Sequence, residues 1–291
     1  MTTKTLNRVL RSQGGHWVGD GFPVQSLLSY NSGLDQLQSP FLLLDYAGPH
    51  DFAPTERRLG VGAHPHRGFE TVTIVYDGEV EHRDSSGAGG KIGKGDVQWM
   101  TAASGIIHEE FHGRDFARRG GRFEMVQLWV NLPAKDKMNP PGYQGILDSQ
   151  IPVAELPDEQ GKVRVIAGSF AGQQGPAHTH TPINMWDMQL NAGANVGIDV
   201  PAGHSTALLV LQGSVTINGE TTVQAAEVGL FDLAGSHFQL DSHSGASVLL
   251  LAGEPLNEPV VGYGPFVMNT QEEINQAIRD YQEGKMGIIN I

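Results

Sequence analysis

Short β-branched segments that end at glycine-containing turns recur along this sequence of 291 residues. Residues 71–76 are one such run, and they meet Asp77-Gly78, a dipeptide typical of hairpin turns. Similar segments occur at 40–45, 97–100, 106–112, 123–130, 162–168, 184–190, 206–211 and 247–251. Because short extended segments separated by turns, together with 38 glycines, are typical of strands and hairpins, we expect an all-β protein.

The pattern begins again after about residue 145, which predicts two β-domains of one type. Aligning Gly78 with Gly213 places 71–76 over 206–211, and this alignment implies a break at Gln212-Gly213. Asn218-Gly219 is a further hairpin signal. We therefore expect an N-terminal domain at 1–144 and a C-terminal domain at 145–291.

The end of the chain has a different pattern. Thr270 and Glu273 have the spacing of a helix capping box, and apolar residues at 274, 277, 278 and 281 fall on one helical face. Gly284 is a stop signal for a helix. The sequence therefore predicts one C-terminal helix with a structural role, packed on the β-domains.

The charge balance excludes several classes of partner. The sequence has 19 basic and 32 acidic residues, a net charge of −13, which repels phosphate backbones and anionic lipid surfaces. We expect no direct nucleic-acid binding and no membrane association, since the longest apolar runs, such as 248–252, are too short to span a bilayer. Cysteine is absent, so thiolate ligands are excluded. No apolar segment follows the basic residues near the N-terminus, so we expect no secretory signal. We expect a cytoplasmic protein.

The stretch HPHRGFE at 64–70 carries the clearest chemical signal. His64 and His66 share one face of a strand and lie about 6.6 Å apart along it, at about 3.3 Å per residue. Both imidazoles can then reach one metal ion at about 2.1 Å. Glu70 shares this face in an extended strand, and Pro65 indicates a strand start or an edge.

A second part of the predicted site follows some forty residues later. In a strand at 106–112, His108 and Glu110 share a face and Glu109 points the other way. His64, His66, His108 and Glu110 together offer three imidazoles and a carboxylate. Such a set suits Fe(II), Mn, Ni, Cu or Zn, and it leaves coordination positions open for substrate or O2.

The same segment also matches the zinc-peptidase pattern H-E-x-x-H at 108–112. That chemistry requires a helix, on which the two histidines share a face. Gly105 and Gly113 flank the segment and no capped amphipathic window surrounds it, so we favour a strand. We interpret His112 as a surface histidine.

The second half of the sequence lacks an equivalent site. Under the glycine alignment the positions of His64 and His66 are occupied by Asp199 and Pro201. His178 and His180 form another H-x-H pair, but no partner carboxylate is evident, and we interpret this pair as part of a polar strand or loop.

Several of these motifs resemble those of the pirin family, over roughly residues 15–285. The matching segments are PFLLLD at 40–45, HPHRGFET at 64–71, GDVQWMTA at 95–102, GIIH at 105–108, QLWVNL at 127–132 and GEPLNEPV at 253–260. The resemblance implies two cupin barrels with a metal in the N-terminal barrel only. Carried over residue by residue, the metal ligands fall on His64, His66, His108 and Glu110. Glu70, at the position that the general cupin pattern uses, then orients a histidine or the pocket.

The resemblance also implies an activity, because pirin-like proteins include quercetin 2,3-dioxygenases. These cleave a flavonol ring with O2 and release CO. The implied cofactor is one divalent transition metal per chain, with Fe(II) favoured over Mn, Ni, Cu or Zn. Glu110 would take the proton of the flavonol 3-hydroxyl. The expected ligands are a small aromatic substrate and O2.

Two alternative functions stay open at the level of the sequence. Some family members are regulatory proteins that act through a protein partner, and an acidic surface suits a basic partner. A cupin enzyme that acts on another small phenol or on a sugar is the third hypothesis.

Overall fold

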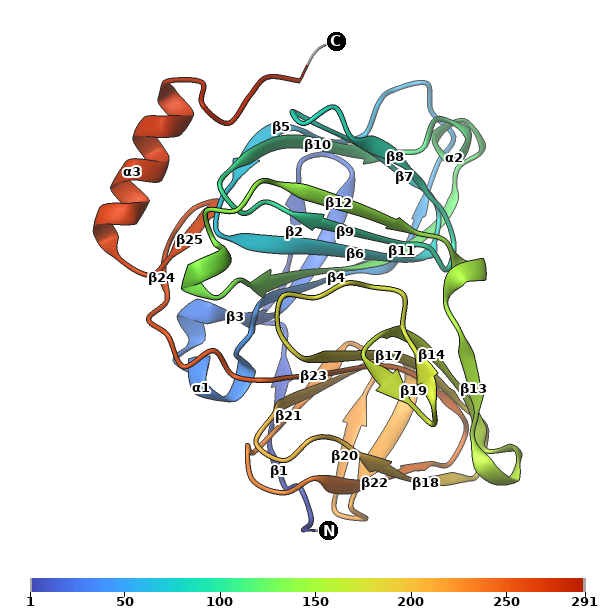
Figure 1. The fold of residues 1–291 in the computed structure, drawn as a ribbon. Coiled ribbons are helices and arrows are strands. Elements are labelled where there is room, and N and C mark those ends of the chain that lie inside the picture. The colour runs from blue at the N-terminus through green and yellow to red at the C-terminus, as the bar shows by residue number, and fades with distance from the viewer. Residues whose placement is uncertain (1, 290–291) are drawn as a thin grey trace. The chain divides into compact units, whose positions relative to one another are not determined.

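The computed structural model describes residues 2–289 and consists mostly of antiparallel strands (Figure 1). It confirms the all-β fold and the single long helix near the C-terminus. By contacts the chain divides into two compact units. We call one the N-barrel, made of Gln13–Ser26, Phe41–Asp148 and the chain from Glu258, and the other the C-barrel, made of the chain up to Ser12, Leu27–Pro40 and Ser149–Asn257.

Neither unit is a continuous half of the chain. The expected domain boundary between residues 144 and 145 lies close to Asp148, where the chain passes from the N-barrel to the C-barrel. The first strand, β1, pairs with β21 and so belongs to the C-barrel. The helix α3 packs on β24 and β25 and so belongs to the N-barrel. Each end of the chain therefore lies in the unit formed mainly by the other half of the sequence.

The N-barrel has a four-stranded sheet in the order β5-β10-β7-β8 and a seven-stranded sheet in the order β12-β9-β6-β11-β4-β3-β2. The strands are β2 (Gly15–Val18), β3 (Phe22–Ser29), β4 (Phe41–Phe52), β5 (Gly60–His66), β6 (Phe69–Asp77), β7 (Val80–Asp84), β8 (Gly89–Ile92), β9 (Val97–Thr101), β10 (Ile106–His112), β11 (Gly121–Asn131) and β12 (Gly142–Ile146). One apolar cluster of this unit contains the buried residues Phe22, Phe116 and Phe123 with aliphatic neighbours.

The C-barrel is a single ten-stranded network with an apolar core that includes buried Trp186, Phe231 and Phe238. Its strands are β1 (Leu6–Arg11), β13 (Val153–Glu155), β14 (Gly161–Ala167), β17 (Ile183–Leu190), β18 (Ala194–Asp199), β19 (Ser205–Ile217), β20 (Thr221–Gln224), β21 (Glu227–Phe231), β22 (His237–Ser242) and β23 (Ala246–Gly253). Two short hairpins complete the chain, β15 (Ser169–Phe170) with β16 (Gln173–Gln174), and β24 (Val261–Tyr263) with β25 (Phe266–Met268).

The expected break at Gln212-Gly213 is wrong, because β19 runs through it. The chain absorbs the irregularity as a register shift between Val210 and Gln212 against β23. Gly213 has a φ of +75°, and a Cβ there would lie 2.3 Å from the carbonyl oxygen of Gly245. This glycine therefore serves a bulge and a close backbone approach rather than a turn. The hairpin predicted at Asn218-Gly219 is confirmed, since it joins β19 to β20.

The helix α3 (Gln271–Gln282) begins with the predicted capping box, in which Thr270 and Glu273 exchange hydrogen bonds with each other's backbone N–H groups. Figure 1 shows it, in red, next to β24 and β25. Two short helices, α1 (Asp35–Gln38) and α2 (Arg114–Arg119), were not predicted. Within the part of the chain that the structure describes, no helix is long and apolar enough to cross a membrane.

Two buried cations tie the C-terminal segment to the turn between β5 and β6. Arg67 donates to Asp280 of α3 at 2.8 Å and to the carbonyl of Ser104 at 2.6 Å. The Lys137 ammonium donates to the carbonyls of Gly68 and Val267 at 2.6 and 3.0 Å, and to the side chain of Asn131. The turn that follows His66 is therefore held by charge-assisted hydrogen bonds.

Candidate metal centre

Three neighbouring strands of the N-barrel bring polar side chains to one interior face. In the ladders of β10, His108 pairs with His64 of β5 and with Asp84 of β7, while Glu110 pairs with His82 of β7. Because residues two apart in a strand share a face, His66 lies on the face of His64, and all six side chains point the same way. The antiparallel pairing thus assembles a polar cluster from three segments of the sequence.

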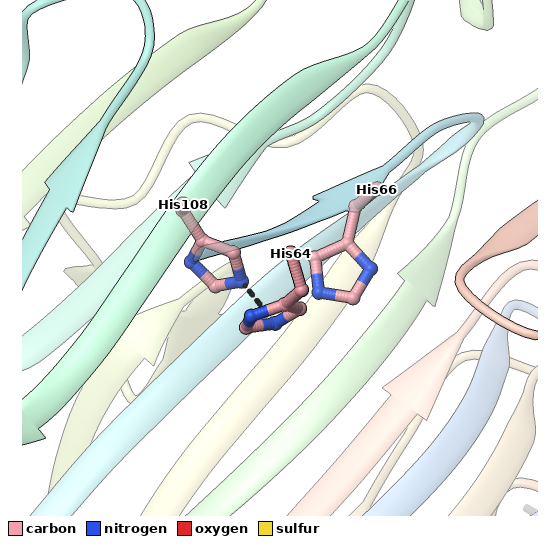
Figure 2. A group of neighbouring side chains, drawn as sticks. All are labelled: His64, His66 and His108. Carbon is pink, nitrogen blue, oxygen red and sulfur yellow. Dashed lines mark hydrogen bonds between the residues drawn. The ribbon is translucent and has the colours of Figure 1, made fainter. Parts of the chain in front are cut away.

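The rings of His64, His66 and His108 lie close together (Figure 2). One ring nitrogen from each histidine lies within 4.8 Å of the others, and the Nε2 atoms of His64 and His108 are 2.9 Å apart. Two ligands bound at about 2.1 Å and at right angles to one ion lie about 3.0 Å apart. The spacing therefore fits two adjacent ligands of a single metal ion.

In His64 and His66 the second ring nitrogen, Nδ1, forms a hydrogen bond with a backbone carbonyl. The Nδ1 of His64 is 2.8 Å from the oxygen of Gly62, and the Nδ1 of His66 is 3.4 Å from the oxygen of Pro265. A carbonyl can only accept, so each Nδ1 carries the hydrogen and each Nε2 presents a lone pair. Both side chains are thus oriented for ligation through Nε2.

Burial favours the neutral form of two of these imidazoles, His66 and His108. Loss of hydration, with repulsion from His64, lowers the pKa of His66 to about 3. Burial, followed by repulsion from His66, also holds the pKa of His108 well below its ordinary value. Because only a neutral imidazole can bind a metal, these side chains are ready to ligate across the physiological pH range.

Glu110 lies beside this trio rather than inside it. Its carboxylate belongs with His82 and His108 to a second group whose ligand atoms are within 4.8 Å of one another. Gln127 donates to it at 3.0 Å, and Gln98 and Thr73 donate at 3.4 Å. Of the four predicted ligands the structure thus brings three imidazoles together and places the carboxylate next to His108.

His82 and Asp84 also lie in this cluster, although no sequence motif pointed to them. Both are buried, at 1% and 4% exposed, and the Nε2 of His82 is 3.1 Å from Asp84. A signal for them existed, because Val80, His82 and Asp84 alternate along β7 and the apolar Val80 identifies the inward face.

Glu70 does not lie on the face of His64 and His66. Strand β5 ends at His66 and β6 begins at Phe69, so the assumption of one continuous strand was wrong. Thr73 contacts Glu110, and alternation along β6 places Glu70, three residues earlier, on the opposite face. Its carboxylate accepts a hydrogen bond from Thr101 at 2.7 Å.

The H-E-x-x-H match is excluded as a peptidase motif, because residues 106–112 form a strand. The interpretation of His112 as a surface residue is also wrong, since it is 2% exposed. Its Nε2 donates to the carbonyl of Gly21 at 2.8 Å, and its ring packs against Phe52 and Phe123. This histidine belongs to the aromatic core rather than to the polar cluster.

Within residues 2–289, the groups able to hold a metal lie in the N-barrel. His178 and His180 lie in an irregular segment between β16 and β17, as expected for a loop. The position aligned with His64 is Asp199, whose carboxylate is 2.8 Å from His237 near the surface. The C-barrel thus shares the architecture without the cluster.

Comparison with known proteins finds relatives for both halves of the chain. Residues 21–130 match the family model described as Pirin, and 185–287 match the Pirin C-terminal cupin domain. A provisionally named quercetin 2,3-dioxygenase of Pseudomonas aeruginosa is 60% identical over 93% of this chain and 94% of its own. Pirin-like protein 2 of Arabidopsis thaliana is 40% identical over 92% of this chain and 81% of its own.

A solved structure is similar over the whole length of the chain. The crystal structure of quercetin 2,3-dioxygenase from Acinetobacter baumannii superposes with a TM-score of 0.96 at 51% identity, over 99% of this chain and 100% of that chain. The sequence motifs, the two barrels and these relatives show that this chain belongs to the pirin family of two-domain cupin proteins.

Proposed function

We propose that this protein is a metal-dependent dioxygenase that cleaves a flavonol such as quercetin with O2 and releases CO. The observation that carries the proposal is the convergence of three imidazoles beside a hydrogen-bonded carboxylate in the N-barrel. Such a donor set, with coordination positions left for further ligands, is typical of metal-dependent oxygenases. The names of the similar Pseudomonas and Acinetobacter proteins indicate the substrate class.

In this proposal His64, His66, His108 and Glu110 hold one divalent transition metal ion, with Fe(II) as our choice and Mn, Ni, Cu or Zn as alternatives. Imidazole and carboxylate ligands are common to all of these metals. When bound, the ion would supply Lewis acidity and a template for the substrate oxygens and O2.

The side chains of the chain itself perform the remaining tasks. Glu110 takes the proton from the flavonol 3-hydroxyl, so that the substrate binds as an oxyanion. Gln127 and Gln98 donate to the Glu110 carboxylate from two other strands and hold it in place beside His108. The rings of Phe69 and Trp129 contact the His66 ring at centroid distances of 5.1 and 5.3 Å and restrict its orientation.

The test is the loss of quercetin absorbance in air with protein reconstituted with Fe(II). His66→Ala removes one proposed ligand, and His180→Ala is a matched control because it truncates the other H-x-H pair, in the C-barrel. We expect turnover by the parent and by His180→Ala, and none by His66→Ala. Metal analysis of each variant separates loss of the ion from loss of chemistry.

The result that would contradict the proposal is a parent protein with one bound ion per chain that consumes no O2 with any flavonol tested. The cluster would then be a metal site without this activity. A metal-binding regulator that acts through a protein partner would become the better hypothesis.

A further inference from the structure

The most heavily buried ionisable pair in the polar cluster is one that the proposed function does not use. The side chains of His82 and Asp84 are both 0% exposed and lie 3.1 Å apart. Burying such groups is unfavourable unless hydrogen bonds compensate for the lost hydration, so their partners indicate what they do. His82 contacts His108, one of the proposed ligands.

The positions of the hydrogens in this pair follow from its partners. The Asp84 carboxylate can only accept, so the Nε2 of His82 carries the hydrogen and donates to it. In the tautomer with its hydrogen on Nε2, the Nδ1 of His82 is an acceptor. Two groups point at it, the side-chain amide nitrogen of Gln98 at 3.2 Å and the Nδ1 of His108 at 3.3 Å.

It follows that the Nδ1 of His108 is a donor and that its Nε2 presents a lone pair. The Nε2 of His64 also presents a lone pair, because its Nδ1 donates to the carbonyl of Gly62. Two lone pairs that face each other at 2.9 Å repel unless a cation lies between them. These hydrogen-bond directions therefore suit a metal ion bound by both Nε2 atoms.

We propose that Asp84 and His82 are positioning residues that hold His108 as the Nδ1–H tautomer and aim its Nε2 at the metal. This inference rests on the metal centre of the proposed function, and it adds two residues to which no role has been assigned. We call the chain of hydrogen bonds from Asp84 through His82 to His108 the relay, and the metal ion would bind His108 at its end.

The outer end of the relay is anchored to the backbone. One oxygen of Asp84 accepts hydrogen bonds from the backbone N–H of Ser86 at 2.8 Å, the Ser86 hydroxyl at 2.6 Å and the N–H of Ala88 at 3.2 Å. The other oxygen accepts from His82. The turn between β7 and β8 therefore fixes the carboxylate. Tyr143 stacks on the His82 ring with an interplanar angle of 16° and restricts its rotation.

A second arrangement uses some of the same atoms, since His82, His108 and Glu110 also form a group of metal-ligand spacing. In that arrangement the ion would bind His82 through Nδ1, which already accepts from Gln98 and His108. The trio of His64, His66 and His108 has facing lone pairs and no such competition. The structure therefore favours a relay over a ligand role for His82.

The experiment measures Co(II) affinity by competition with a chromogenic chelator, together with the visible spectrum of the Co(II) protein. His82→Phe removes the acceptor, and His82→Gln returns one through its amide oxygen. Asp84→Asn keeps the shape but no longer enforces the direction of the hydrogen bonds. His112→Phe is the matched control, since it removes another buried histidine of the N-barrel that lies in the aromatic core.

We expect His82→Phe to weaken Co(II) binding about 10- to 100-fold and to shift the visible bands, as for other partners of metal-bound histidines. His82→Gln and Asp84→Asn should fall between this variant and the parent, whereas His112→Phe should bind Co(II) as the parent does. In the Zn(II) protein labelled with 15N, NMR should show a hydrogen on the Nδ1 of His108 in the parent. That hydrogen should exchange faster with solvent in His82→Phe.

Parent-like affinity and spectra in a folded His82→Phe or Asp84→Asn variant would refute the relay. Complete loss of binding in His82→Phe with normal binding in His66→Ala would place the ion in the second group and overturn the relay as well. A parent protein that binds no Co(II) would instead remove the metal centre on which both proposals rest. Quercetin turnover does not enter these measurements, so its failure is recognised separately.

Discussion

The contact between Arg67 and Asp280 offers a sharp test of how the N-barrel is held together. Asp280→Asn keeps the volume of the side chain but removes its charge. The two side chains are 5% and 11% exposed and meet at 2.8 Å. Without the carboxylate, a guanidinium remains buried beside His66 with a weaker acceptor, and this is the source of the expected destabilisation.

The magnitude follows from the partners that remain. Removal of one member of a buried ion pair destabilises by about 3–5 kcal/mol. Here Arg67 keeps its hydrogen bond to the carbonyl of Ser104 at 2.6 Å, so we expect the lower limit, about 3 kcal/mol. Because every 1.4 kcal/mol corresponds to a factor of ten, amide hydrogens of α3 should exchange roughly 100-fold faster through local opening.

Hydrogen exchange followed by mass spectrometry on peptides from 271–282 measures this effect. Glu272→Gln is the control, because it removes an exposed carboxylate from the same helix. The double variant Arg67→Met/Asp280→Leu should recover much of the protection, since a hydrophobic pair replaces a buried ion pair at little cost. Exchange in Asp280→Asn within threefold of the parent would refute the claim that this ion pair anchors the helix.

The remaining predictions concern acidity, the turn after His66, the buried lysine and the helix cap. Hydrogen bonds from Arg67, with Lys285 and Gln276, hold the pKa of the Asp280 carboxyl well below its usual range, so its charge stabilises the fold fully above about pH 4 and less as the pH falls further. The difference in urea midpoint between the parent and Asp280→Asn should therefore shrink below about pH 4. A difference that stays constant with pH would contradict this prediction. Gly68→Ala should destabilise the fold by more than about 2 kcal/mol and weaken Co(II) binding, because φ is +91° and the new Cβ would lie 1.9 Å from the carbonyl oxygen of Val267. Gly87→Ala is the control in urea denaturation, since this glycine has a φ of +86° but open space around it, so that the variant reports backbone strain without a clash. Lys137→Met leaves three buried acceptors without their donor and should lower the free energy of unfolding by about 2–4 kcal/mol, and an unchanged urea midpoint would show that this lysine is dispensable. Thr270→Ala should cost about 1 kcal/mol of helix stability, measured as faster exchange in the first turn of α3, which Thr270→Ser should restore.

Features that depend on a few neighbouring residues were predictable. The short β-branched segments identified central strands such as β6, β11 and β23, and the capping box marked the start of α3. His64, His66, His108 and Glu110 were found because residues two apart share a strand face whatever the rest of the fold does. Local rules failed where the chain bends. The alternation of strand faces does not continue from His66 to Glu70, because the chain turns at Gly68, and Gly213 lies in a bulge rather than a turn.

Features that depend on pairing between distant segments were decided by the tertiary structure alone. His82 lies twenty-six residues from His108, and only the ladder between β7 and β10 brings them within 3.3 Å. The terminal segments are a second case, since β1 joins the C-barrel and α3 joins the N-barrel. Periodicity records which way a side chain points in its own strand, so it determines the candidate ligands. It carries no record of which strand lies alongside, so the residues that orient those ligands emerge only when the sheets form.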